Sequence, residues 1–71
     1  MLEKKALIES VLLLLKPKEA LVLKMHYLHE LSIKEINEST GFSIANIKVL
    51  LFRARKNFMH HYLNTNKGKN E

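Results

Sequence analysis

The sequence predicts an all-α domain of four helices that contains a helix-turn-helix and no sheet. Apolar residues recur at helical spacing along most of the chain, and no run alternates apolar and polar residues convincingly enough for a strand. The few Gly and Pro residues fall where helices should break. A chain of 71 residues forms one domain at most.

A proline separates the first two predicted helices. Residues 2–15 are expected to form the first helix, which is apolar on more than one side toward its end and should be well buried or bound to a partner. Pro17 suits the first position of a helix, so the second helix is expected over residues 17–29. Its apolar residues at helical spacing are Ala20, Leu21, Met25 and Leu28.

Local capping signals delimit a short third helix. Ser32 is followed three positions later by Glu35, a capping-box pattern that predicts a helix over residues 33–40. Gly41 then fits the left-handed turn position that glycine adopts most easily. This helix, its tight turn and the longer helix that follows are the parts of a helix-turn-helix, with Ile36 packed inward.

The fourth helix is expected to be the longest. Ser43 is its predicted N-cap, and residues 44–63 are its predicted extent. Residues 64–71 contain no apolar residue and many weak helix formers, so they are expected to be a disordered or frayed tail. The sequence thus predicts a single helical domain over residues 1–63, followed by this tail.

Two faces of the fourth helix have different compositions. On a wheel of about 100° per residue, Leu51, Ala54 and Phe58 fall within about 40° of Ile47, and Leu50 lies about 60° to one side. These residues are predicted to form the buried stripe. The opposite face carries Ala45, Val49, Phe52, Arg53 and Lys56, with Asn46 and Lys48 on its flanks.

The charge of the chain is unevenly placed. The formal net charge is +5, and every acidic residue except Glu71 lies at or before Glu38. Residues 39–70 contain six Lys and Arg residues and no acid. This asymmetry indicates a polyanionic partner, with a solvated basic surface as the alternative.

In a helix-turn-helix, the first residues of the second helix meet base edges in the major groove of double-stranded DNA. Asn pairs with adenine, and a small apolar side chain contacts the methyl group of thymine. Basic residues further along the helix hold phosphates. The predicted DNA-binding residues are Ser43, Ala45, Asn46, Lys48, Val49 and Phe52, with Arg53, Arg55 and Lys56 as the phosphate contacts.

A series of short motifs follows in a fixed order between Pro17 and Phe58. It comprises Pro17, Leu31-Ser32, Glu35-Ile36, Gly41, Ile47-Lys48 and Leu51-Phe52-Arg53-Ala54-Arg55. This stretch resembles region four of bacterial sigma factors, especially those of the extracytoplasmic-function group. The Arg53-Ala54-Arg55 ending is the most discriminating part, and the stretch covers more than half of the chain.

The resemblance implies a winged-helix-like fold without a sheet and a role in transcription initiation. Its last helix would recognise the minus-35 promoter element, and the domain would contact the beta flap of RNA polymerase and, as in many members, an anti-sigma factor. Carried over by position, the DNA-proximal residues would be Asn46, Lys48, Val49, Leu50, Arg53 and Arg55.

The chain departs from the family pattern at three positions. Val49 and Leu50 stand where members often have Ser-Arg, which removes one basic contact, and Asn37 replaces a small Ala. No region-two domain is present in the sequence. The chain is therefore expected to be an excised domain, or a stand-alone relative that cannot initiate transcription alone.

Several function classes find no support in the sequence. The chain has no Cys and no Asp, no Gly-rich phosphate loop and no nucleophile-base pair at a recognised spacing, so no enzyme and no cofactor are expected. His26 and His29 share a helix face, but no carboxylate or thiol completes a metal site with them. The longest apolar run, residues 11–15, is too short for a membrane span, so a cytoplasmic location is expected.

Two alternative functions stay open at this stage. One is a LuxR-type transcriptional regulator, which shares the Ser-x-x-Glu-Ile start and the Ile-Lys pair but rarely has Arg-Ala-Arg. The other is a protein-interaction module without DNA binding, which would use Val49, Leu50 and the Leu-rich first helix to bind polymerase, an anti-sigma-like partner or a second copy as a homodimer.

Overall fold

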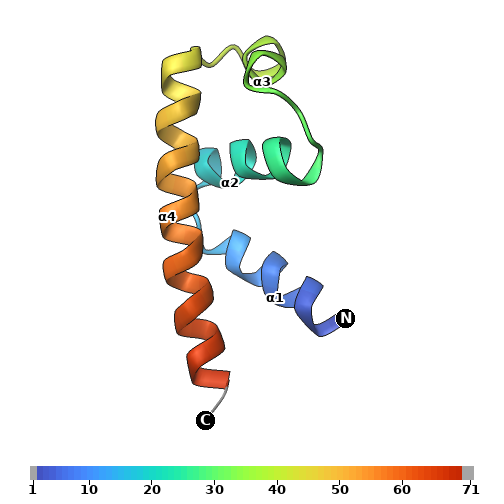
Figure 1. The fold of residues 1–71 in the computed structure, drawn as a ribbon, viewed down its shortest axis with the longest axis vertical. Coiled ribbons are helices and arrows are strands. Elements are labelled where there is room, and N and C mark those ends of the chain that lie inside the picture. Colours follow the sequence, from blue (N-terminus) through green and yellow to red (C-terminus); the bar gives the residue numbers. More distant parts are fainter. Residues whose placement is uncertain (1, 70–71) are drawn as a thin grey trace.

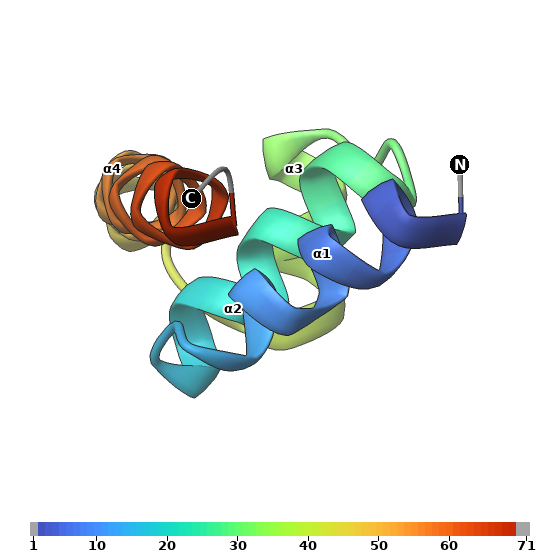
Figure 2. The same cartoon turned by 90° about the horizontal axis from the view of Figure 1, so that it is seen from below.

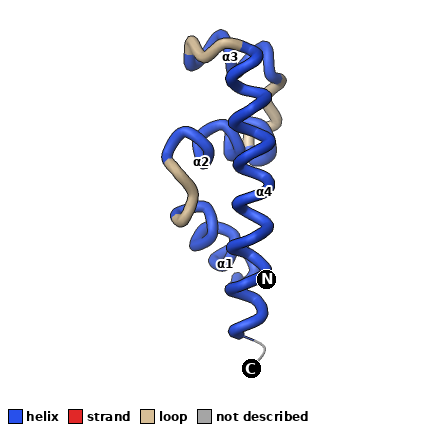
Figure 3. Tube along the Cα trace, turned by 90° about the vertical axis from the view of Figure 1, so that its left-hand side faces the viewer, coloured by secondary structure: helices blue, strands red, loops and turns tan. Residues whose placement is uncertain are grey.

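The computed structural model describes residues 2–69 and has four α-helices and no strand among them (Figures 1 and 3). A π-helical turn, η1, directly continues the second α-helix. The elements are α1 (Leu2–Leu13), α2 (Pro17–Leu23), η1 (Lys24–Leu28), α3 (Ile33–Thr40) and α4 (Ile44–Lys69). The predicted all-α, four-helix fold class is confirmed.

Helix α4 is the axis of the molecule. It runs along the longest of the three dimensions, which are 43 × 21 × 15 Å (Figure 1). The other three helices are stacked along one side of α4, and the view from below shows the opposite side of α4 uncovered (Figure 2). Each of them packs against α4. One long side of α4 therefore stays open to a ligand.

The core is a single cluster along the inner side of α4. The predicted stripe is confirmed, since Ile47, Leu51 and Ala54 are buried and Phe58 is half-buried against the cluster. Burying one large aliphatic side chain contributes about 1.5–3 kcal/mol to stability. The cluster consists of Leu12, Leu15, Val22, Leu23, Ile36, Ile47, Leu50, Leu51 and Ala54.

The first helix ends earlier than the sequence predicts. Its last regular residue is Leu13, and the Leu14 and Leu15 amides then donate to carbonyls three residues back, at 2.9 and 3.2 Å. Lys16 has an extended backbone conformation, because the ring of a proline disfavours the helical conformation of the residue before it. The expected burial of this helix end holds only in part, because Leu15 is buried whereas Leu13 and Leu14 are exposed.

The second predicted helix forms, but its last turn widens. In η1 the His29 amide donates to the Lys24 carbonyl (3.1 Å), which is π-helical spacing. The chain then reverses direction, and the Leu31 amide donates a hydrogen bond to the Met25 carbonyl oxygen (2.9 Å). His26 Nδ1 donates to the Leu31 carbonyl oxygen (2.9 Å). The helical conformation thus ends at Leu28, one residue before the predicted end.

This reversal forces Glu30 into the left-handed region, with a φ of 56°. The left-handed conformation costs a non-glycine residue roughly 1–2 kcal/mol, and glycine avoids this cost. Glycine also increases the entropy of the unfolded chain, which offsets part of the gain in stability. We therefore expect Glu30→Gly to raise the free energy of unfolding by about 0.5–1 kcal/mol, measured by urea denaturation. The matched control is Glu38→Gly in α3, which should lower it by about 1 kcal/mol. A similar loss in both variants would contradict the prediction.

Both ends of α3 follow the predicted local chemistry. The Glu35 amide donates to Ser32 Oγ (3.0 Å), and the Ser32 amide donates to Glu35 Oε1 (2.8 Å), so the capping box is confirmed. Gly41 has a φ of 80° and donates its amide to the Asn37 carbonyl (2.8 Å). The predicted helix over residues 33–40 is confirmed at both ends.

The predicted end of the fourth helix at Leu63 is wrong, because α4 continues to Lys69. Once a helix is nucleated, each added residue gains one backbone hydrogen bond, so weak helix formers do not stop it without a proline or a cap. The tail expected over residues 64–71 is therefore helical as far as Lys69, and residues 70 and 71 lie outside the described residues. The domain boundary at Leu63 stays a prediction.

A buried polar contact fixes α2 on α4. Asn57 Nδ2 donates to Glu19 Oε1 (3.0 Å), and Glu19 is only 4% exposed. Removing the amide would leave a buried carboxyl oxygen without this partner, so we expect Asn57→Ala to lower stability by about 1–3 kcal/mol in thermal or urea unfolding. Asn64→Ala, at an exposed position of the same helix, is the control and should change stability little. Equal effects of both changes would refute this role of Asn57.

Candidate nucleic-acid interface

The turn between α3 and α4 is held by side chains from α3. Asn37 Nδ2 donates to the Phe42 carbonyl oxygen (2.6 Å). Thr40 Oγ1 donates to the Ile36 carbonyl (2.7 Å) and accepts from the Phe42 amide (3.1 Å). The bulkier Asn37 thus bonds the turn directly, a role that the sequence analysis did not foresee.

Ser43 begins α4 as predicted. Its Oγ accepts a hydrogen bond from the Asn46 amide (3.1 Å), and its carbonyl accepts from the Ile47 amide (2.9 Å). The Ser43 oxygen therefore satisfies one of the free amides of the first turn and sets the direction in which the helix leaves Gly41. Ser43 itself stays exposed, at the end of α4 nearest α3.

An exposed surface extends along α4 opposite the core stripe. We call it the outer face and define it by Ala45, Val49, Phe52 and Lys56, which lie within about 60° of one another around the helix. Val49 is 44% exposed and Phe52 is 67% exposed. The core therefore leaves these apolar side chains available to a ligand.

The outer face has a basic residue on each side. Arg53 and Lys48 are both exposed and lie about 60° and 80° from Lys56, in opposite directions around the helix. Exposed Asn46 lies on the same side as Arg53. The structure thus places eight of the nine predicted DNA-binding residues at the N-cap and in the first half of α4, within about 160° around the helix.

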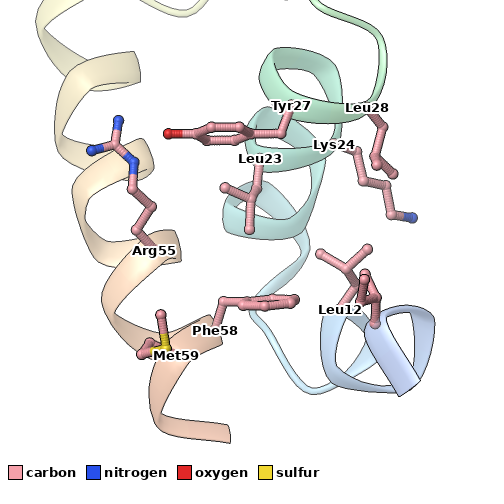
Figure 4. A pocket seen from close by; sticks show the side chains of 9 residues that line it. Leu12, Leu23, Lys24, Tyr27, Leu28, Arg55, Phe58 and Met59 are labelled. Atoms are coloured by element: carbon pink, nitrogen blue, oxygen red, sulfur yellow. The ribbon is translucent and has the colours of Figure 1, made fainter. Parts of the chain in front are cut away.

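Arg55, the ninth, lies beyond Lys48 at the edge of this surface. It is exposed, but its guanidinium carbon lies 5.7 Å from the centroid of the Tyr27 ring (Figure 4). Around the helix, Arg55 is turned about 100° from Lys56 and lies about 20° from Lys48. Its predicted phosphate contact stays a prediction, and Tyr27 is the partner that the structure gives it.

The DNA-proximal position that the sigma-factor resemblance implies for Leu50 is wrong. That resemblance placed Leu50 among the DNA-proximal residues, but it is 8% exposed and belongs to the core cluster. It lines a hollow of about 410 Å³. The other lining residues are Lys16, Pro17, Lys18, Glu19 and Arg53.

Lys16 and Lys18, which were not among the predicted DNA-binding residues, line this hollow with Arg53. Lys18 Nζ also lies 5.6 Å from the centroid of the Phe42 ring, beside the helix-turn-helix turn. The signal available in the sequence was the pair of cations that bracket Pro17. Positive charge thus extends from the Arg53 side of α4 onto the start of α2.

Residues 5–58 match the family model described as Sigma-70, region 4. The chain belongs to the sigma-70 region 4 family. Region 4 is a family of DNA-binding domains, not of enzymes, that recognise promoters in transcription initiation and interact with RNA polymerase. No curated protein and no solved structure matches the chain.

The region 4 domain also has an apolar groove between α1, η1 and α4, with a volume of about 450 Å³. Leu12 and Phe58 approach each other across it, and Tyr27 and Arg55 lie at its other end (Figure 4). Ile8, Leu23, Lys24, Leu28 and Met59 complete the lining. The groove faces the η1 side of α4, away from Arg53.

The described part of this region 4 domain contains no group of three or more His, Cys, Asp or Glu side chains that could hold a metal ion. Two of the histidines bond elsewhere, His26 to the Leu31 carbonyl and His60 Nε2 to Asn64 Nδ2 (3.3 Å). Within the same residues, no helix has the length and apolar character that a bilayer crossing requires.

Proposed function

We propose that the outer face of α4 and its flanks bind the minus-35 element of a promoter. Ser43, Ala45, Asn46, Val49 and Phe52 meet base edges in the major groove. Lys48, Arg53 and Lys56 hold phosphates on either side. The observation that supports this assignment is the open side of α4, where an apolar strip lies between basic residues and residues 39–70 contain no acid.

The dimensions of α4 suit this role. A major groove about 12 Å wide admits one α-helix, and here the first turns of α4 are held at a fixed angle by the Asn37 and Ser43 hydrogen bonds. A helix positioned in this way presents the same side chains to the same base pairs. We assign Arg55 to the apolar groove, because its described partner is Tyr27.

We further propose that the apolar groove between α1, η1 and α4 binds RNA polymerase, through the beta flap. Six of its nine lining residues are aliphatic, Phe or Met, and the groove is turned away from the Arg53 side of the outer face, so one domain can bind both partners. Leu28→Glu and Met59→Glu, at exposed lining positions, should weaken polymerase binding in a pull-down and leave DNA binding intact. Loss of DNA binding alone would contradict this division.

Three finer assignments belong to the same proposal. The Leu51-Phe52-Arg53-Ala54-Arg55 segment supports the extracytoplasmic-function group, and a promoter-binding role supports a cytoplasmic location. The region 4 match favours a sigma-type domain over a LuxR-type regulator. An anti-sigma factor or a homodimer would use the exposed apolar residues of α4, in competition with DNA.

Fluorescence anisotropy of the chain with 20-base-pair duplexes, repeated at several salt concentrations, tests the DNA-binding surface. Binding should be micromolar or tighter at low salt and should fall linearly on a log–log plot as salt rises, because each neutralised phosphate releases counterions. Absence of binding at low salt would rule out this domain as a DNA reader on its own. Binding that did not depend on salt would rule out the phosphate contacts.

A further inference from the structure

The part of α4 that would enter the groove contains few groups able to recognise guanine. Guanine is most often read by a bidentate Arg or Lys. Between Ser43 and Phe52 the only cation is Lys48, which is turned about 100° from its neighbour Val49 and lies at the side of the outer face. Leu50, the next residue after Val49, is buried.

The same part of α4 offers an apolar surface instead. Ala45, Val49 and Phe52 are exposed, and Val49 and Phe52 lie outside the core cluster. The apolar group that a base pair presents in the major groove is the C5-methyl of thymine. Val49 and Phe52 are about 4.5 Å apart along the helix axis. This is close to the spacing of about 3.4 Å between stacked base pairs.

Asn46 lies at the edge of this surface. Its amide proton is bonded to Ser43 Oγ, whereas its side chain is exposed and about 60° from Val49 around the helix. An Asn side chain can donate a hydrogen bond to N7 of adenine and accept one from its N6 amino group. Among the four bases, adenine alone presents this pair of groups in the major groove. An adenine contact and a thymine-methyl contact therefore fall within one turn of α4.

We propose that this domain selects duplexes by their A·T pairs, with Val49 and Phe52 against thymine methyl groups and Asn46 on an adjacent adenine. The proposal rests on DNA binding by the outer face and names the class of sequence which that face takes. Ala45 to Phe52 spans about 10 Å of helix, so the recognised tract is about three to four base pairs long.

The test begins with selection of duplexes from a pool of 20-base-pair DNA with a randomised centre. The affinity of a selected duplex is then compared with that of the same duplex carrying deoxyuridine for thymine, which keeps base pairing and removes the methyl groups. We expect enrichment of consecutive A·T pairs and a loss of about fourfold in affinity per contacted methyl, as for one buried CH₂-sized group. Loss of two methyl groups should give roughly tenfold or more.

Variants locate the contact. Phe52→Ala and Val49→Ala should each abolish the thymine–uracil difference at one position of the duplex. Leu63→Ala, which removes an exposed apolar side chain further along α4, is the matched control and should keep the full difference. Since all three side chains are exposed, circular dichroism should show unchanged helix content in each variant.

The outcomes separate this inference from the proposed function. Equal binding of thymine and uracil duplexes, with the salt dependence retained, would overturn methyl recognition and leave DNA binding in place. Selection of G·C pairs at the centre, or a thymine–uracil difference that persists in both variants, would also overturn it. Failure to bind any duplex at low salt would remove the proposed function and this inference together.

Discussion

Replacing Lys48, Arg53 and Lys56 together by Ala should weaken duplex binding by roughly several hundred-fold at about 0.1 M salt. Each phosphate neutralised on B-DNA adds about 0.9 to the magnitude of the log–log salt slope, so three lost contacts reduce it by about 2.7. The three side chains are exposed and lie outside the core, and the variant should therefore keep its fold. Anisotropy titrations of both proteins at four or more salt concentrations measure the slope directly.

A single pair of variants provides the control for this prediction. Lys24→Ala removes an exposed lysine at the apolar groove, away from Arg53, and should leave the salt slope unchanged. Lys56→Ala removes one from the outer face and should lower the slope by about 0.9. Equal slopes for the two single variants would mean that DNA binding depends on overall charge and not on the outer face.

Ile47→Ala should destabilise the domain by about 2–5 kcal/mol, because it removes transfer free energy and leaves a cavity. Ile47 is fully buried near the start of α4 and belongs to the one core cluster that joins all four helices. Domains of this kind have about 5–15 kcal/mol of stability in total. The variant should therefore melt far below the wild type, by about 4–8 °C for each kcal/mol lost.

Two milder changes show whether the effect comes from burial. Ile47→Val removes one methylene and should cost about 0.5–1.5 kcal/mol. Ile44→Ala changes an isoleucine that is 46% exposed one turn earlier in α4, and its effect should be much smaller than that of Ile47→Ala. Thermal unfolding followed by circular dichroism compares all three. A loss for Ile44→Ala equal to that for Ile47→Ala would contradict the assigned core.

The sequence predicted best where structure depends on neighbouring residues alone. Three predicted local features form: the capping box at Ser32, the left-handed turn at Gly41 and the cap at Ser43. Each depends on hydrogen bonds between residues no more than four positions apart. The helix ends at Leu13 and Lys69 were missed for another reason. At Leu13 the chain tightens ahead of Pro17, and between Leu63 and Lys69 no proline interrupts α4.

The site was predictable as a face but not as a set of contacts. Helical periodicity identifies which residues of α4 are exposed, and Val49 and Phe52 follow it. Arg55 is different, because its partner Tyr27 lies on a π-turn whose register sequence periodicity does not reveal. Leu50 is buried above the start of α2, which depends on how two distant segments pack. Such contacts are set by tertiary structure.

The order of the helices along the chain constrains how the domain folds during synthesis. Three helices pack on α4, but all three are synthesised before it. At 5–20 residues per second, a ribosome needs roughly 2–9 s to proceed from the end of α1 to Phe58. During that interval the side chains of α1 lack the α4 surface against which this helix packs. Packing of the core therefore cannot be completed helix by helix from α1 onward, and the contacts of α1 with α4 form only after α4 is synthesised.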